Sequence, residues 1–220
     1  MRASGLLTWF AFAGACLVAA LVYAFSSMGR SGATPARLAL AGAAVNALLI
    51  GLIYAVLILS QDTFDAYRFW VVGSLAAANA APILTVLPFI VIGTILSFVL
   101  APSLNALALG DDTARAIGTR IGLVRFGALA AVTLTSGAAV AVAGPVGFAG
   151  LVVPHIARAL AGNDQRWLMV YAAVLGPAVL LAADVLGRVV LPPGEVQVGI
   201  IMALVGGPLF VAIVRTMRLA

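Results

Sequence analysis

Residues 104–125, LNALALGDDTARAIGTRIGLVR, form the one long polar break in a chain that is otherwise almost continuously apolar. Gly110 and Gly118 divide this stretch into pieces that are long enough only for helices of one or two turns. Asp111 after Gly110 is expected to cap the first turn, and Gly118 is expected to end the helix. A structured polar loop between apolar helices is typical of a docking surface, here expected on the cytoplasmic side.

The composition places the chain in a bilayer. Of its 220 residues, 64% are hydrophobic and 9% are charged, and the mean hydropathy is +1.20, whereas a soluble domain is about 25% charged. The net charge of +5 comes from arginines at the ends of apolar runs, which indicates topology control and not nucleic-acid binding. The single cysteine, Cys16, excludes an intramolecular disulfide and is expected to be a small packing residue.

Apolar runs predict the membrane spans, because a helix needs about 20 residues to cross the hydrocarbon. The expected spans are 6–25, 38–59, 82–100, 126–143, 167–190 and 197–214. The last of these is expected to be interrupted at Gly206, Gly207 and Pro208, and residues 60–70 are expected to form an amphipathic link. The fold class predicted is therefore an all-α polytopic membrane bundle.

The run GPVGFAG at 144–150 predicts a broken helix. Only ten apolar residues, 151–160, follow before the polar AGNDQR, and ten helical residues cover about 15 Å, half the hydrocarbon thickness. Extended backbone at that depth must be buried in protein or line a cavity, and discontinuous helices tend to mark transport pathways. With this arm the chain makes about seven crossings.

The arginines fall unevenly on the two sides of the alternating crossings. Nine lie on one side and only Arg2, Arg68 and Arg188 on the other. This bias places residues 104–125 and the C-terminus in the cytoplasm and the N-terminus outside. An odd number of crossings that starts outside predicts further N-terminal sequence.

The run GPVGFAGLVVPHIARALAGNDQR is similar to the signature of the FecCD-type permeases, the membrane subunits of ABC importers for iron-siderophores, haem and vitamin B12. ALGDDTARAIGTRIGLVR resembles their cytoplasmic coupling segment, ADVLGRVVLPPGEVQVGIIMALVGGPLFVAIVR their C-terminal helix pair, and FWVVGSLAAAN their outer loop before the sixth helix. The resemblance covers essentially the whole chain and corresponds to helices four to ten of a ten-helix permease. It implies one transmembrane permease domain over 1–220, with 104–125 as its coupling loop.

The resemblance also implies a function and partners. The chain would be a permease subunit that carries an iron chelate, siderophore or haem, inward across a bacterial inner membrane. It would pair with a second permease, two ATP-binding subunits that use ATP and Mg²⁺, and an external substrate-binding protein. The chain itself would bind no cofactor or nucleic acid and would not be an enzyme; it contains no phosphate-binding GxxxxGK[ST] motif.

Two groups of residues are expected on the cytoplasmic side. The ATPase-coupling residues are predicted to be Leu107, Gly110, Asp111, Asp112, Ala114, Arg115 and Gly118; the alternative is a merely solvated loop. Pro154, His155 and Arg158 are expected at the cytoplasmic end of the short helix, as support for that loop. A lone histidine could also serve a metal site or a proton relay, but no second ligand accompanies it.

Two further groups are expected at the path and at the outer face. The translocation path is predicted at Gly144, Pro145, Gly147, Phe148 and Gly150, with simple helix packing as the alternative. Arg188 is expected to dock the binding protein, with Arg68 and Glu195 as weaker candidates; Asp184, four residues before Arg188, is expected to be its structural i,i+4 partner. The chain lacks the clustered ligands that iron binding would need.

Three other functions compete with this interpretation. One is a permease for vitamin B12. Another is a proton-coupled secondary carrier that uses Asp184 and His155 as a relay. An intramembrane enzyme would need a nucleophile and base, or metal ligands, at one depth, and the isolated His155 argues against it.

Overall fold

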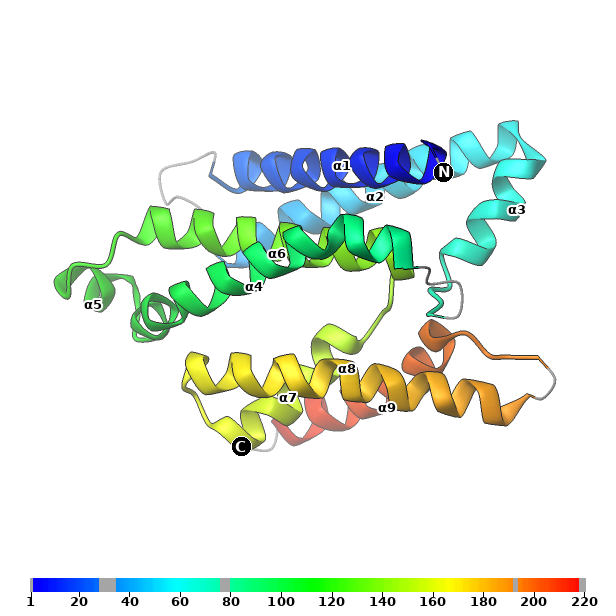
Figure 1. Cartoon of the computed structure of the whole chain (residues 1–220). Helices are drawn as coiled ribbons and strands as arrows, with labels where there is room; N and C mark the ends of the chain where they lie inside the picture. The colour runs from blue at the N-terminus through cyan, green and yellow to red at the C-terminus, as the bar shows by residue number, and fades with distance from the viewer. Residues whose placement is uncertain (1, 28–34, 76–79, 192–193, 218–220) are drawn as a thin grey trace. The chain divides into compact units, whose positions relative to one another are not determined.

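The computed structural model describes residues 2–27, 35–75, 80–191 and 194–217 (Figure 1). All regular secondary structure in these ranges is helical, which confirms the predicted all-α class. The chain divides into two compact units, Met1–Phe69 and Trp70–Ala220. The units are described one at a time below. Arg30, the end of the FWVVGSLAAAN motif and Arg218 lie outside the described residues.

The first unit is built from two long apolar helices and one short amphipathic helix. Helices α1, Arg2–Ser27, and α2, Pro35–Leu59, pack against each other. Helix α3, Gln61–Trp70, confirms the amphipathic link that was expected at 60–70. The Ser60 hydroxyl oxygen accepts a hydrogen bond from the Thr63 backbone N–H at 3.3 Å, so Ser60 caps this helix.

The second unit begins with a helical hairpin that carries a short helix at its tip. Helix α4, Ala80–Ala108, lies along α6, Ile121–Ala143, and α5, Asp111–Ala116, contacts both. The predicted ends of these spans were wrong. Helix α4 continues through Pro102 although a proline removes one helical hydrogen bond and crowds the preceding turn, because the extra turns bury Ala101 and Ala106. Helix α6 begins before the predicted residue 126, because its first turn buries Ile121 and Val124.

Three helices complete the second unit. Helix α7, Ala149–Ala161, packs against α8, Gln165–Val190, and α9, Val198–Met217. Their shared core consists of Ala183, Val198, Ile201 and Met202. The predicted interruption of the last span at 206–208 was wrong, since α9 is continuous through Pro208.

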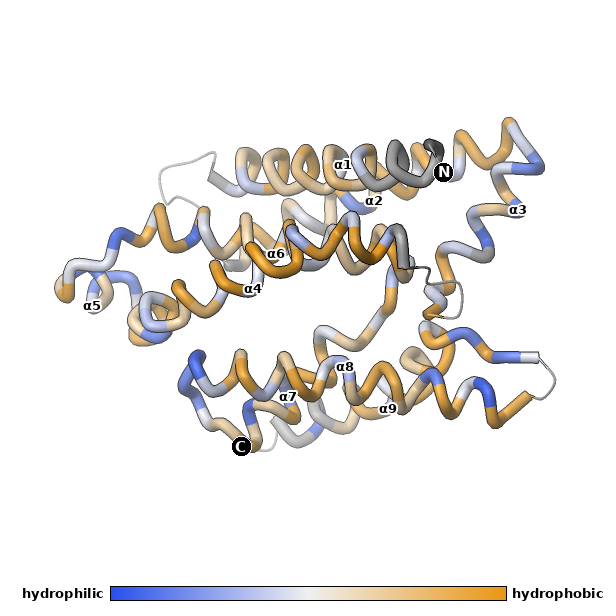
Figure 2. The backbone as a smooth tube through the Cα atoms, in the orientation of Figure 1, coloured by the Kyte–Doolittle hydropathy of each residue, from blue (hydrophilic) through white to orange (hydrophobic). Residues whose placement is uncertain are grey.

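The described helices have the lengths and surfaces of a polytopic membrane protein. Five are long and apolar enough to cross a bilayer, and α7 and the described apolar part of α9 are shorter. Large apolar side chains face outward all along them; Ile58 and Leu59 are 85% and 84% exposed. Hydrophilic residues gather instead along α3, at α5, at the turn between α7 and α8 and at the C-terminal end of α8 (Figure 2). These outward apolar surfaces are what a bilayer would cover.

Candidate functional site

The α5 loop, defined here as residues 109–120, ends in a complete Schellman motif. Helix α5 stops at Ala116, and Gly118 adopts a φ of +84°, which a side chain would disfavour. The Gly118 backbone N–H donates to Arg115 O and the Thr119 N–H to Ala114 O, both at 2.9 Å. The prediction that Gly118 ends the helix is confirmed.

The start of α5 differs from the prediction. Gly110 occupies the N-cap position, and Asp111 is the first residue of the helix, with no side-chain cap. Both carboxylate oxygens of Asp111 instead accept hydrogen bonds from Nη2 of Arg125, at 2.9 and 3.0 Å. Hydrogen bonds between two charged groups are stronger than a neutral cap, so the arginine on α6 outcompetes the local backbone.

The seven predicted coupling residues lie together, but they face different ways. Ala114 is 0% exposed and packs with Ala106, Ile121 and Leu107 inside the loop. Asp112 and Arg115 face outward and pair at 3.0 Å between Oδ1 and Nη1. The exposed members are therefore Gly110, Asp112, Arg115 and Gly118, whereas Ala114 shapes the loop from within.

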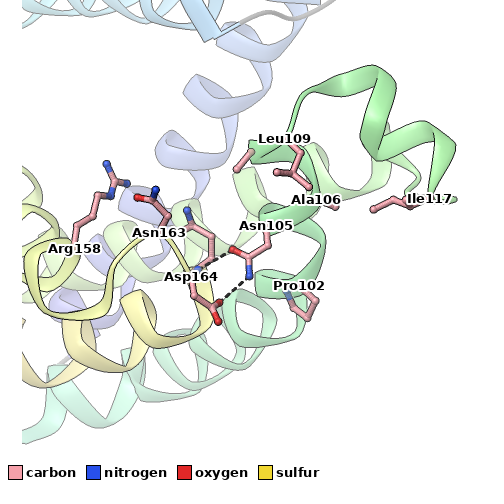
Figure 3. A pocket seen from close by; sticks show the side chains of 10 residues that line it. Pro102, Asn105, Ala106, Leu109, Ile117, Arg158, Asn163 and Asp164 are labelled. Atoms are coloured by element: carbon pink, nitrogen blue, oxygen red, sulfur yellow. Dashed lines mark hydrogen bonds between the residues drawn. The ribbon is translucent and has the colours of Figure 1, made fainter.

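The turn between α7 and α8 adjoins the end of α4, and Asn105 joins the two. Its Nδ2 donates to Asp164 Oδ1 at 2.8 Å, and its Oδ1 accepts from the Gln165 backbone N–H at 2.8 Å (Figure 3). Asp164 caps α8 by accepting from the Arg166 backbone N–H at 2.9 Å. Asn105 thus joins the start of the 104–125 stretch to the α7–α8 turn. It was not among the predicted site residues.

These hydrogen bonds favour the ionised form of Asp164. The amide of Asn105 is the largest cause, followed by the Arg166 backbone N–H, and together they lower the pKa of the carboxyl below its ordinary 3.8. An open cavity of about 740 Å³ lies beside this contact (Figure 3). Its lining includes Leu109 and Ile117 from the α5 loop, and Arg158 and Asn163 from the α7–α8 side.

The predicted support residues lie along α7. Pro154 and His155 are near the middle of the helix and not at its end, because α7 continues to Ala161. Both are half-buried, whereas Arg158 is exposed and reaches the 740 Å³ cavity. Of these three residues, only Arg158 lines the cavity that Leu109 and Ile117 of the α5 loop also line.

Residues 144–148 form a non-helical linker between α6 and α7, as predicted. The Ala143 carbonyl, at its start, accepts from the Ser74 backbone N–H at 2.9 Å. Phe148 ends the linker with φ +62° and ψ −20°, the one left-handed non-glycine residue in the described part of the chain. Gly150, expected in extended backbone, lies instead in the first turn of α7.

Phe148 fits into a notch on α9. A Cβ built on Gly206 would lie 2.5 Å from Phe148 Cβ and 2.9 Å from its Cγ, so no side chain fits there. A second cavity, of about 450 Å³, lies nearby between α6, α7 and α8. Its lining is uncharged and mostly apolar, and it combines small residues such as Ala139, Gly150 and Gly176 with the hydroxyl-bearing Thr135 and Ser136. The start of α7, directly after the linker, thus borders an open, uncharged cavity.

Of the three residues predicted to dock a binding protein, Arg188 and Glu195 lie close to each other. Arg188 Nε pairs with Asp184 Oδ2 at 2.9 Å, and its Nη1 lies 3.9 Å from Glu195 Oε2. The i,i+4 pair expected from the sequence is therefore present. Arg68 belongs to the first unit, where its Nε lies 3.4 Å from Asp65 Oδ1. Within the described ranges, no three His, Cys, Asp or Glu residues cluster as metal ligands would.

Comparison with known proteins agrees with this all-helical architecture. A solved chain described as an inward-facing conformation of a metal-chelate type ABC transporter superposes with a TM-score of 0.82, over 97% of this chain and 74% of that one. Its sequence is 24% identical, so this likeness concerns the fold alone.

Sequence relatives define the family. A sequence model described as the FecCD transport family matches residues 3–216. The ferric enterobactin permease FepD of Escherichia coli is 42% identical over 206 residues, 93% of this chain and 61% of FepD. The Fe(3+)-citrate import permease YfmD of Bacillus subtilis is 40% identical over 209 residues, 95% and 62% respectively. The chain belongs to the FecCD transport family, as its motifs predicted.

The relatives are longer than this chain. The hemin permease HmuU of Yersinia pestis is 36% identical and matches 94% of this chain but 62% of its own length. The chain thus spans about three fifths of the curated relatives that it matches. The family comprises transport proteins and not enzymes, in agreement with the function class expected from the sequence.

Proposed function

We propose that the chain is a permease subunit of an ATP-driven importer that carries an iron chelate into the cytoplasm. The match over residues 3–216 is the observation that carries this proposal. Relatives named for ferric enterobactin, Fe(3+)-citrate and hemin support iron chelates as the substrate class. In this proposal the chain lies in a bacterial inner membrane with its C-terminus inside, and 1–220 acts as one permease domain.

The α5 loop is the proposed docking surface for an ATP-binding subunit, which would hold the ATP and Mg²⁺. Two properties support this role. The loop projects Asp112 and Arg115 outward, and it is held rigidly by the Gly118 motif and the Asp111–Arg125 pair. A rigid loop can transmit a displacement to α4 and α6, the two long helices that it joins. A second permease and a second ATP-binding subunit would complete the membrane assembly.

The outer face and the interior have separate proposed roles. Arg188, at 52% side-chain exposure, would exchange its pairs with Asp184 and Glu195 for a carboxylate on an external binding protein. Residues 144–150 would line the path, since the neighbouring cavity offers small apolar groups and no metal ligands. A chelated ion needs such a surface, because the chelator and not the protein provides its ligands.

The energy source separates this proposal from a proton-coupled carrier. The chain would be reconstituted in liposomes with its ATP-binding subunit and binding protein, and supplied with radio-iron-labelled ferric citrate, ferric enterobactin and hemin. We expect uptake of one of them with internal ATP and none with a proton gradient alone. Uptake driven by the gradient without ATP would overturn the proposal. Cobalamin in the same assay tests the vitamin B12 alternative.

Charge reversal tests the docking surface directly. The double change Asp112→Arg and Arg115→Glu keeps an opposite-charge pair at these exposed positions while it reverses the pattern that a partner would meet. We expect at least a tenfold loss of the ATP-binding subunit that co-purifies with the chain, because like charges across an interface cost several kcal/mol. The matched control reverses Asp65 and Arg68, another i,i+3 pair. Undiminished co-purification after the first reversal would refute the assignment of the loop.

A further inference from the structure

The second unit contains two groups of helices with one direct helix contact between them. Helices α4, α5 and α6 contact one another, and α7, α8 and α9 contact one another. Among the described residues, the packing of α4 against α8 is the helix-to-helix contact that joins these groups. A displacement of the α5 loop can reach α7 through this contact, through the backbone linker at 144–148, or through residues 70–75, where the Ser74 N–H donates to Ala143 O and Gly73 O accepts from the Gly199 N–H. The α4–α8 contact is the one of these routes that lies beside the α5 loop.

Asn105 lies at the polar end of that contact. It is close to the C-terminus of α4, just before the α5 loop, and its side chain meets the first residues of α8 (Figure 3). One amide group makes two hydrogen bonds of opposite sense: Nδ2 donates to Asp164 and Oδ1 accepts from the Gln165 backbone N–H, both at 2.8 Å. Because both ends of the amide are held, its orientation relative to the α8 N-terminus is fixed.

The partner of Asn105 is itself anchored. The same Asp164 oxygen accepts from the Arg166 backbone N–H and so caps α8. The carboxylate is charged, which strengthens both bonds relative to neutral ones. Asn105 therefore holds the end of a 26-residue helix, and α7, which begins directly after the linker, packs along that helix.

We propose that Asn105 is a positioning residue that transmits displacement of the α5 loop to α8, and through α8 to α7 and the 144–148 linker. This inference rests on the proposed function, since it needs an ATP-binding subunit that moves the loop. It assigns the transmission to one side chain whose two hydrogen bonds are both made within the chain. Without the two bonds, α4 and α5 would move while α8 lagged behind, and ATP would be hydrolysed with less transport.

The test measures iron transported per ATP hydrolysed by the complete assembly in liposomes, with whichever of ferric citrate, ferric enterobactin or hemin the unchanged assembly takes up. Asn105→Ala is expected to lower this ratio about fivefold or more, the range of typical coupling between sites. Asn163→Ala is the matched control, because Asn163 lines the same cavity but has no part in the two bonds. It is expected to leave the ratio unchanged.

If the Asn105→Ala protein does not assemble, exchanging the amide and the carboxylate between positions 105 and 164 provides a second test. Asn105→Asp sets a carboxylate against Asp164 and is expected to lower the ratio similarly. Adding Asp164→Asn provides an amide that can donate back, so the double variant is expected to recover to within about twofold of the unchanged assembly. A merely structural role would alter the amount of assembled complex and not the ratio.

Two results would overturn the inference. One is an unchanged ratio in both Asn105→Ala and Asn105→Asp; the other is a double variant that recovers nothing over Asn105→Asp alone. Either result leaves the proposed function intact, provided that the unchanged assembly transports iron with ATP. Failure of that unchanged assembly to transport would instead refute the proposed function.

Discussion

The α5 loop and the linker at 144–148 both interrupt apolar helices, and they are stabilised in opposite ways. The loop is held by charged side chains, with Asp111 bound twice by Arg125 and Asp112 paired with Arg115. The linker relies on backbone hydrogen bonds and on Phe148 in its notch at Gly206. In the proposed arrangement the linker lies within the bilayer, where water cannot replace a lost polar contact as it can at the loop. The linker should therefore tolerate substitution less well.

The largest expected effect is at the notch. Gly206→Ala places a methyl group 2.5 Å from Phe148 Cβ, so the linker or α9 must shift, and overpacking of this kind costs about 1–3 kcal/mol. Thermal unfolding of the purified protein in detergent measures the loss. Gly207→Ala is the matched control, since its methyl group would lie 4.0 Å from Phe148 Cζ, an ordinary contact.

A second substitution identifies the source of that loss. Phe148→Gly removes the Cβ that the Gly206 methyl group would meet, and it suits the left-handed backbone. Phe148→Gly also removes the packing of the ring, so the comparison is made within that background: there, Gly206→Ala should lower the melting temperature by less than it does in the otherwise unchanged protein. Equal melting temperatures for the Gly206→Ala and Gly207→Ala proteins would show that the notch does not constrain the linker.

A smaller effect is expected in the α5 loop. Asp111→Ala removes both hydrogen bonds from Arg125; the two side chains are 39% and 30% exposed, so screening by water limits the expected loss to about 1 kcal/mol. The melting temperature measures it. Asp112→Ala is the control, because that side chain is fully exposed and its pair with Arg115 should contribute little. A larger loss for Asp112→Ala than for Asp111→Ala would contradict this account of how the loop is held.

The smallest effect is a pH dependence at Asp164. Folding lowers the pKa of this carboxyl, so its stabilising contribution is present above the ordinary value of 3.8 and is lost as pH falls through the lower folded value. Melting temperatures of the unchanged protein and of Asp164→Asn should therefore differ most near neutral pH and converge below about pH 4. A difference that is constant across this range would show that the charge of Asp164 makes no contribution.

The sequence predicted what depends on neighbouring residues. The hydrogen bonds that end α5 are donated by Gly118 and by the next residue, Thr119, to carbonyls in the preceding turn. Neighbouring residues therefore determine this turn. The glycine-rich run at 144–150 likewise predicted the linker, because glycines so close together weaken a helix. The family followed from the same local motifs.

The sequence could not predict what depends on distant residues. Asp111 looks like a cap until Arg125, fourteen positions away, is found to bind it. Asn105 meets partners 59 and 60 residues later, which no periodicity indicates. The run Gly206-Gly207-Pro208 suggested a break in a helix, whereas Gly206 instead makes room for an aromatic ring on another element. In each case tertiary contact decided the role of the residue.

The Schellman motif at Gly118 also affects the thermodynamics of association. A flexible loop that orders on binding loses conformational entropy, and this loss reduces the affinity that its contacts could provide. The α5 loop has its backbone turn closed and its arginine paired within the chain itself. A protein that docks there meets a preformed surface, so association should proceed nearly as a rigid-body step, with a small entropic cost on this side of the interface.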